Sequence, residues 1–181
     1  GKTVFEGGTD EAVDFYLNNE NMQLGSGIAD YKDVELGTGD LQLLQVSVTD
    51  NMQRIRTVFL QSEAIHVQII FLAKTELKGM RINLSVKNSY GVVAFVTSSH
   101  ELTKSGISKG EHTLKLIIPA YLLNKTQYTL TLNAGIPGKR VLIEPIDILL
   151  VNIEGENAGG STYIEKWPGL VSPKLEWTLD E

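Results

Sequence analysis

The chain contains no cysteine and no long run of apolar side chains. Without cysteine, neither a disulfide nor a thiolate metal site can form, and this composition suits a reducing compartment. The longest apolar stretches, such as 69–73, have the length of a β-strand. They fall far short of the roughly 20 residues that a membrane-spanning helix needs. We therefore expect a soluble domain.

Positive charge is also scarce. The 181 residues include 16 Lys and Arg against 22 Asp and Glu, which gives a formal net charge of −6. The basic residues are scattered along the chain, whereas nucleic-acid binding requires clustered Lys and Arg to contact phosphates. A nucleic-acid partner is therefore not expected.

Sequence motifs for catalysis are missing as well. The glycines at 25, 27, 37 and 39 do not supply the spacing GxxxxGK[ST] of a phosphate-binding loop, and no nucleophile elbow occurs. The three histidines, His66, His100 and His112, lie far apart and lack carboxylates at ligand spacing. We expect no metal, no cofactor and no enzymatic activity. A pair of acids for glycoside hydrolysis remains open, with Glu144, Asp147, Glu154 and Glu156 as candidates.

The chain does contain a series of segments in which polar and apolar residues alternate. Seven such segments lie between residues 41 and 153, separated by Gly, Asn, Asp, Ser and Pro. They span 41–50, 64–74, 80–87, 92–97, 111–118, 127–134 and a last stretch that ends near 153. Period-two alternation with frequent turn residues predicts an all-β protein, specifically an immunoglobulin-like antiparallel β-sandwich.

The two ends of the chain have a different pattern. Residues 11–17 are predicted to form a short N-terminal helix capped by Thr9 or Asp10, and 18–39 an irregular linker. The expected division is therefore helix and linker in 1–40 and sandwich in 41–181. The second part includes a strand at 174–179 after the glycine-rich break 155–160. Because Gly1 rather than Met opens the chain, we expect it to be part of a longer polypeptide.

The alternation also predicts which residues point inward. In the first segment we expect Leu44, Val46 and Val48 to be buried. In the later segments we expect the same of Ile65, Val67, Ile69, Phe71, Ala73, Ile82, Leu84, Val86, Tyr128, Leu130, Leu132 and Ala134. Pro145 predicts that the last strand lies at a sheet edge or is bulged near its start, because proline cannot donate a ladder hydrogen bond.

The outward residues of three segments form the candidate binding face. An immunoglobulin-like order would put segments 80–87, 127–134 and the last one in the same sheet. The predicted site residues are Arg81, Asn83, Ser85, Thr129, Thr131 and Asn133, with Asp147 beside them. Amide, guanidinium and hydroxyl groups in a row suit sugar hydroxyls, which both donate and accept hydrogen bonds. The plain alternative is a solvated sheet face.

Three aromatic residues, Tyr90, Phe95 and Trp167, are candidates for stacking on a sugar ring. Tryptophans such as Trp167 and Trp177 are, however, more often anchors of a core or an interface. On the other sheet, Ile70, Leu72 and Ile117 would form an apolar outer patch. We expect the N-terminal helix, the C-terminal tail or a second subunit to cover it.

Four short segments give the chain a resemblance to a known family. They are Ala12-Val13-Asp14-Phe15-Tyr16-Leu17, Gly37-Thr38-Gly39-Asp40-Leu41, Val86-Lys87-Asn88-Ser89-Tyr90-Gly91 and Pro173-Lys174-Leu175-Glu176-Trp177. With them, nearly the whole chain resembles the C-terminal domain of the nucleotide-binding subunit (Wzt type) of bacterial O-antigen polysaccharide ABC transporters. No single motif carries this resemblance.

The resemblance implies a specific role. In that family an N-terminal ATPase domain, absent from this chain, drives export of a lipid-linked polysaccharide through a membrane permease. The C-terminal domain is a cytoplasmic carbohydrate-binding sandwich, peripheral to the inner membrane. It recognises the O-antigen polysaccharide, often through its modified non-reducing end. Family members dimerise, in some cases by exchanging C-terminal strands, and their glycan contacts vary, so no binding residue transfers by motif.

Two alternatives remain open. A glycoside-processing enzyme with a sandwich fold would place two acids across one cleft. A structural or adhesive sandwich would bury an apolar patch against a protein and ignore sugars.

Overall fold

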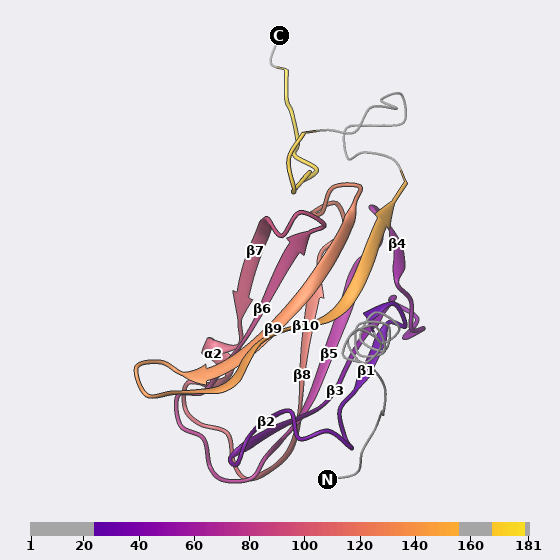
Figure 1. The fold of residues 1–181 in the computed structure, drawn as a ribbon. Helices are drawn as coiled ribbons and strands as arrows, with labels where there is room; N and C mark the ends of the chain where they lie inside the picture. Colours follow the sequence, from indigo (N-terminus) through magenta and orange to yellow (C-terminus); the bar gives the residue numbers. More distant parts are fainter. Residues whose placement is uncertain (1–23, 156–167, 180–181) are drawn as a thin grey trace.

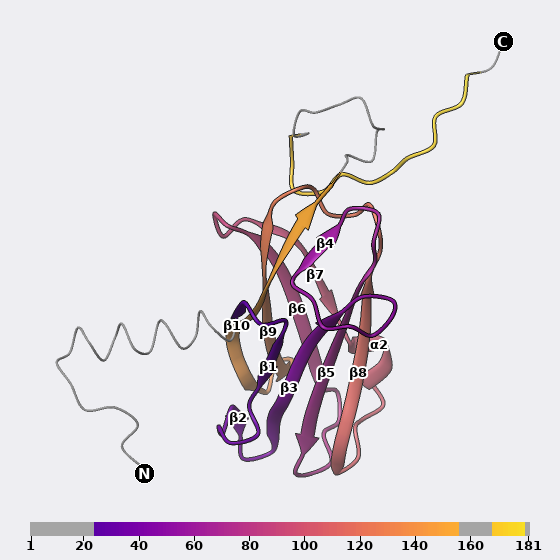
Figure 2. The same ribbon diagram turned by 90° about the vertical axis from the view of Figure 1, so that its right-hand side faces the viewer.

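The protein is an all-β sandwich, as predicted. The computed structural model describes residues 24–155 and 168–179, and the helix predicted at 11–17 lies outside them. Two five-stranded sheets pack face to face (Figures 1 and 2). A single turn of helix, α2 (His100–Thr103), follows β7. Within the described residues, no helix has the length and apolar character needed to cross a membrane.

The first sheet has the order β1-β3-β5-β8, and β2 pairs with β3 beside β1. Its strands are β1 (Ile28–Asp30), β2 (Gly37–Thr38), β3 (Leu41–Thr49), β5 (Ile65–Ala73) and β8 (Gly110–Ile118). The irregular linker predicted for 18–39 is therefore wrong in part, since β1 pairs antiparallel with β3 and Ala29 is fully buried. The sandwich begins before residue 41. Two- and three-residue strands are too short to show periodicity.

The second sheet has the order β4-β10-β9-β6-β7. Its strands are β4 (Val58–Leu60), β6 (Arg81–Asn88), β7 (Val93–Ser98), β9 (Gln127–Ile136) and β10 (Arg140–Glu154). The prediction that three segments share this sheet is confirmed, because β6, β9 and β10 are neighbours. The pairing of β4 with the end of β10 is parallel, which departs from an antiparallel sandwich.

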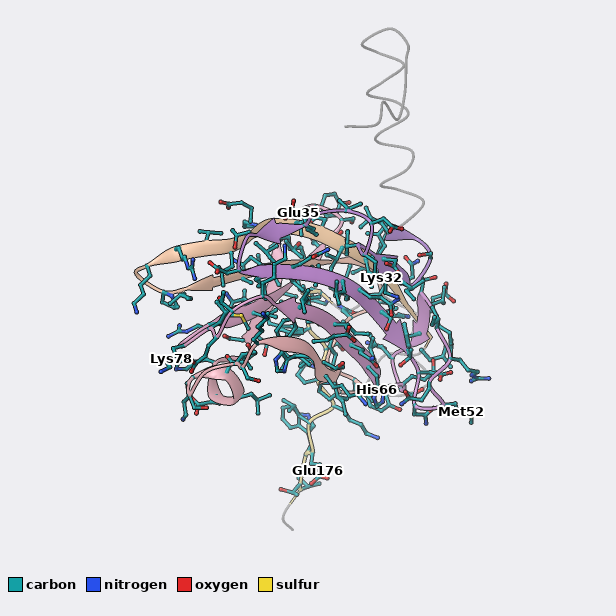
Figure 3. All side chains as sticks on the ribbon, turned by 90° about the horizontal axis from the view of Figure 1, so that it is seen from below. Lys32, Glu35, Met52, His66, Lys78 and Glu176 are labelled. Atoms are coloured by element: carbon teal, nitrogen blue, oxygen red, sulfur yellow. The ribbon has the colours of Figure 1, made fainter. Side chains whose placement is uncertain are left out.

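The core lies between the two sheets, which Figure 3 shows from below with their side chains. All the inward positions predicted for segments 64–74, 80–87 and 127–134 are buried. The prediction for Leu44 is wrong, because Leu41 and Leu43 are buried instead. A register shift between Leu43 and Gln45 in the β3–β5 pairing explains the error. One extra residue reverses the inward and outward positions on either side of a bulge.

The strand β10 is irregular, as Pro145 predicted. Its pairing with β9 shifts register between Val141 and Ile143, between Ile143 and Ile146, and between Asp147 and Leu149. β4 pairs only with Asn152–Glu154, so most of β10 has β9 as its single neighbour within its own sheet. The predicted bulge near Pro145 is confirmed, whereas β10 is not an edge strand in the sheet order, because β4 pairs with its last residues.

The C-terminal segment 168–179 leaves the sandwich after a short anchored part. Tyr128 donates its hydroxyl to the Leu170 carbonyl at 2.7 Å, and Ser172 donates its backbone N–H to the Leu122 carbonyl at 2.9 Å. Beyond it, residues 174–179 pair with none of the described strands, so the strand predicted there is not formed in the single chain. Glu176 lies apart from the sandwich (Figure 3).

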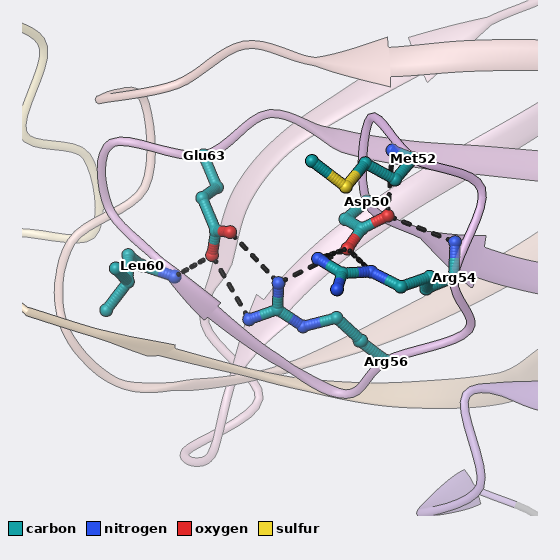
Figure 4. Close-up of polar contacts among 6 residues, drawn as sticks. All are labelled: Asp50, Met52, Arg54, Arg56, Leu60 and Glu63. Atoms are coloured by element: carbon teal, nitrogen blue, oxygen red, sulfur yellow. Dashed lines mark hydrogen bonds and ion pairs between the residues drawn. The ribbon is translucent and has the colours of Figure 1, made fainter.

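An ion-pair network holds the chain where it crosses from β3 in one sheet to β4 in the other (Figure 4). The Asp50 side chain is 1% exposed and accepts hydrogen bonds from the backbone N–H groups of Met52 and Arg54. Its other oxygen faces the guanidinium groups of Arg54 and Arg56. Arg56 in turn forms a two-pronged contact with Glu63, at 2.9 and 3.2 Å.

Burial acts to raise the pKa of Asp50, but the hydrogen bonds from Arg54 and Met52 outweigh it and lower the pKa to about 2. A carboxyl whose pKa is lower in the folded protein stabilises the fold above its unfolded pKa, near 4. This contribution disappears as the pH falls toward 2.

We therefore expect Asp50→Asn to lower the thermal unfolding midpoint by several degrees at pH 7, because the amide presents a donor to two guanidinium groups. Circular dichroism melting at pH 7 and at pH 2.5 measures the effect, with the exposed Asp33→Asn as the control. The difference from the unsubstituted protein should shrink at pH 2.5. Equal melting at pH 7 would show that the network does not stabilise the fold.

Candidate functional site

The six predicted site residues lie on the outer face of the second sheet. In the β6–β9 register, Asn83 pairs with Asn133 and Ser85 with Thr131, while Arg81 faces Gly135 and Lys87 faces Thr129. Directly paired residues project to the same side of a sheet. Their sequence neighbours Ile82, Leu84, Leu130 and Leu132 are buried, so the polar residues face outward. The prediction that these residues share one face of the sheet is therefore confirmed, while their role in binding stays a prediction.

Two neighbouring hollows lie along this face, and Pro145 lines both. The first, which we call the Asp147 hollow, has a volume of about 480 Å³. It is lined by Leu24, Tyr31, Lys87, Thr131, Pro145, Ile146, Asp147 and Ile148. The second, the Arg81 hollow, has a volume of about 520 Å³. It is lined by Arg81, Asn83, Asn133, Glu144, Pro145 and the β9–β10 hairpin with its flanking residues, 134–141.

The Asp147 hollow combines one carboxylate, one ammonium group and an apolar wall. Thr131 donates its hydroxyl to Asp147 Oδ1 at 2.5 Å, and Lys87 Nζ lies 3.9 Å from the same oxygen. The Asp147 side chain is 55% exposed, so ligand hydroxyls can reach it. Tyr31 and Ile146 supply the apolar wall. Donor and acceptor groups beside an apolar surface match the two kinds of surface that a sugar ring presents.

The Arg81 hollow owes part of its space to Gly135. This residue is paired with Arg81 and stands on the same face, where it contributes no side chain. A Cβ at this position would lie 3.1 Å from the Arg140 carbonyl oxygen, so even alanine would crowd the hairpin. The amides of Asn83 and Asn133 stand side by side beside this gap.

A polar contact joins the two sheets at the rim of the Arg81 hollow. Arg140 donates to Asp40 of the β2–β3 turn, and Asp40 also accepts from the Thr75 hydroxyl at 3.0 Å. Hydrogen bonds from Thr75 and then from Arg140 lower the pKa of Asp40 below its usual value. Asp40 therefore neutralises Arg140 at ordinary pH.

The predicted site residues do not all line the same hollow. Arg81, Asn83 and Asn133 line one hollow and Thr131 lines the other. Ser85 and Thr129 lie on the same face but line neither.

The sequence pattern does not indicate Tyr31, Lys139 or Arg140 as residues of these hollows, and it indicates Glu144 only as a candidate acid. Tyr31 follows β1, which is too short to show periodicity, and the hairpin residues lie beyond the regular alternation. Pro145 was the available signal, because it marked a bulge where side chains change direction.

The structure also locates two of the three aromatic residues predicted to stack on a sugar ring. Phe95 is partly buried against the core and lines neither hollow. Tyr90 is 88% exposed at the β6–β7 turn and lines neither hollow. Trp167 lies outside the described residues. On the first sheet, Ile70 and Leu72 are partly buried and Ile117 is 56% exposed, so the cover for that patch stays a prediction.

The described residues also bear on metal binding and acid catalysis. They contain no cluster of three or more His, Asp or Glu side chains that could hold a metal ion. Neither hollow is lined by two carboxylates, since Glu144 belongs to one and Asp147 to the other. The two-acid arrangement of a glycoside hydrolase has no shared cleft here.

No protein-family model and no curated protein sequence matches the chain. Among solved structures, the fold is similar to the crystal structure of the C-terminal domain of Wzt. The TM-score is 0.61 at 12% identity, and the match covers 80% of this chain and 86% of that one. This likeness shows the fold.

Two looser likenesses carry no argument about function. One is to a β-glucosidase from Listeria innocua in complex with gluconolactone, with a TM-score of 0.37 at 10% identity. It covers 61% of this chain and 16% of that one. The other is to the cupredoxin domain of amoB from Nitrosocaldus yellowstonii, with a TM-score of 0.36 at 12% identity, covering 75% and 99%. The shared architecture with the Wzt domain is therefore the comparison that bears on this chain.

Proposed function

We propose that the chain is a non-catalytic carbohydrate-binding domain that recognises O-antigen polysaccharide, through its non-reducing end, and couples it to export by an ABC transporter. The observation that carries the proposal is the outer face of β6, β9 and β10, where two polar hollows lie side by side. The fold likeness to the C-terminal domain of Wzt supports it. In this proposal the domain works in the cytoplasm beside the inner membrane. Its parent subunit carries an ATPase domain and acts with a membrane permease.

The mechanism is binding without turnover. The paired amides of Asn83 and Asn133 and the Thr131–Asp147 pair offer donors and acceptors to sugar hydroxyls. Sugars are well hydrated, and each hydrogen bond to the protein replaces one to water, so we expect weak affinity. Occupancy of the face would then gate export of the finished chain.

The test is an NMR titration of the domain with the O-polysaccharide of its own source strain and with an unrelated one. We expect selective shifts at Asn83, Thr131 and Asn133. The double variant Asn83→Ala, Asn133→Ala should weaken binding about 10-fold or more, because each lost hydrogen bond contributes about 1 kcal/mol.

The matched control is Gln68→Ala, Thr113→Ala, which removes polar groups from the outer face of the first sheet and should leave affinity unchanged. Selective binding with shifts on the first sheet would keep the function and discard this site. No binding to either polysaccharide would favour the protein-interaction alternative.

We also propose that the domain forms a homodimer through segment 168–179. Its anchored part is tied to the sandwich, but Leu175, Trp177 and Leu179 are 68%, 93% and 90% exposed. These alternate residues would share one face of an extended strand, and so large an exposed apolar surface favours a partner. The exchange of C-terminal strands in the resembled family is consistent with that partner being a second copy.

Sedimentation velocity tests the dimer. We expect the unsubstituted protein to sediment as a dimer and the variant Leu175→Glu, Trp177→Glu as a monomer with unchanged melting temperature, because charge on this face opposes burial. Leu102→Glu, at another exposed apolar residue (70% exposed), is the control and should remain dimeric. A monomeric unsubstituted protein would contradict the proposal.

A further inference from the structure

The charges around the two hollows are unequal. The residues that line the Arg81 hollow include three cationic side chains, Arg81, Lys139 and Arg140, and one carboxylate, Glu144. Asp40 neutralises Arg140. The Asp147 hollow holds Lys87 and Asp147, which balance each other. The Arg81 hollow therefore carries excess positive charge on a chain whose net charge is −6.

Arg81 is the cation that lacks a protein partner most clearly. Its Nε is shielded from solvent and has no hydrogen-bond acceptor among the described residues. No ion pair joins Arg81 or Lys139 to any acid in that part of the chain. Arg81 lines the hollow and is only partly buried, so a ligand there can reach the rest of its guanidinium group. The charge on that group favours a ligand that supplies an opposite charge.

The geometry favours an oxyanion over a neutral acceptor. The two terminal nitrogens of a guanidinium group form a planar pair of donors that matches two oxygens of a carboxylate or phosphate. The hollow that Arg81 lines has a volume of about 520 Å³, which leaves room for such a group. Lys139 on the hairpin adds a second, mobile ammonium group at the same hollow.

We infer that the Arg81 hollow is a subsite for a negatively charged substituent of the bound sugar, a carboxylate or a phosphate, while the Asp147 hollow takes a neutral part of the glycan. The inference rests on the proposed carbohydrate-binding function and narrows the ligand to acidic glycans. Asn83 and Asn133 would contact hydroxyls of the acidic sugar itself.

The experiment compares ligands that differ only in charge. Glucuronic acid, its neutral methyl ester, glucose 6-phosphate and inorganic phosphate are titrated into the domain, and backbone and Arg Nε–H signals are followed by NMR. We expect an acidic sugar to bind about 10-fold more tightly than the ester and to shift the Arg81 Nε–H signal. The preference should fall as salt is added, because part of the hollow is open to solvent.

The variants separate charge from geometry. Arg81→Gln should abolish the preference for the acid, and Arg81→Lys should restore only part of it, because lysine cannot make the two-pronged contact. Lys115→Gln, at an exposed cation on β8 of the first sheet, is the matched control and should leave the preference intact. Arg81→Gln should not lower the melting temperature, since the shielded Nε contributes no hydrogen bond within the described structure.

The outcomes distinguish the two proposals. Equal binding of acid and ester would overturn this inference and leave the carbohydrate-binding function standing. Inorganic phosphate that binds at Arg81 as tightly as glucose 6-phosphate would show an ion site and overturn the inference for sugars. If these sugars and the O-polysaccharides all fail to bind, both proposals are overturned. Glucuronic acid and glucose 6-phosphate together decide between a carboxylate and a phosphate.

Discussion

The pairing of β9 with β10 is the constraint on which the candidate site depends. The strand β10 has 15 residues and β9 has 10, and the pair stays in contact only through three register shifts. Each shift turns side chains to the other face of a strand. Pro145 lies within the shifted region and lines both hollows. It lacks the N–H that a regular ladder would use, so it suits this irregular position. A regular β10 would present a flat face without the two hollows.

The same irregularity gives the two hollows different electrostatic character. Glu144 and Asp147 are only three residues apart, yet the bulge directs them to different hollows. The charge of Asp147 is balanced by that of Lys87. Glu144 lines a hollow together with three cationic side chains, of which Arg140 forms an ion pair with Asp40. A glycan that spans both hollows would thus meet a neutral subsite and a positive one. Such a pair of subsites can fix the direction of a chain whose repeating units are alike.

The sequence predicted the regular parts of this arrangement and, through Pro145, the bulge of β10, but it missed the register shift in β3 and the strand β1. Alternation correctly identified the inward residues of β5, β6 and β9, and with them the outward row Arg81, Asn83 and Asn133. It failed at Leu44 because a bulge interrupts the period. It also failed at Tyr31, which reaches the site only through the pairing of β1 with β3. Bulges and long-range pairings depend on tertiary contacts, which local periodicity does not encode.

The C-terminal end of β10 is supported by the ion-pair network around Asp50, and this connects the stability of the fold to the site. The strand β4 pairs with Asn152–Glu154, and Glu63 accepts the Leu60 N–H at the end of β4. Glu63 is in turn bound to Arg56, which also faces the buried Asp50. The charged network therefore fixes β4, and β4 fixes the last residues of β10. Asn152–Glu154 and the bulge at Pro145 belong to one strand, so the network that stabilises the crossing between the sheets also supports the end of the strand that carries both hollows.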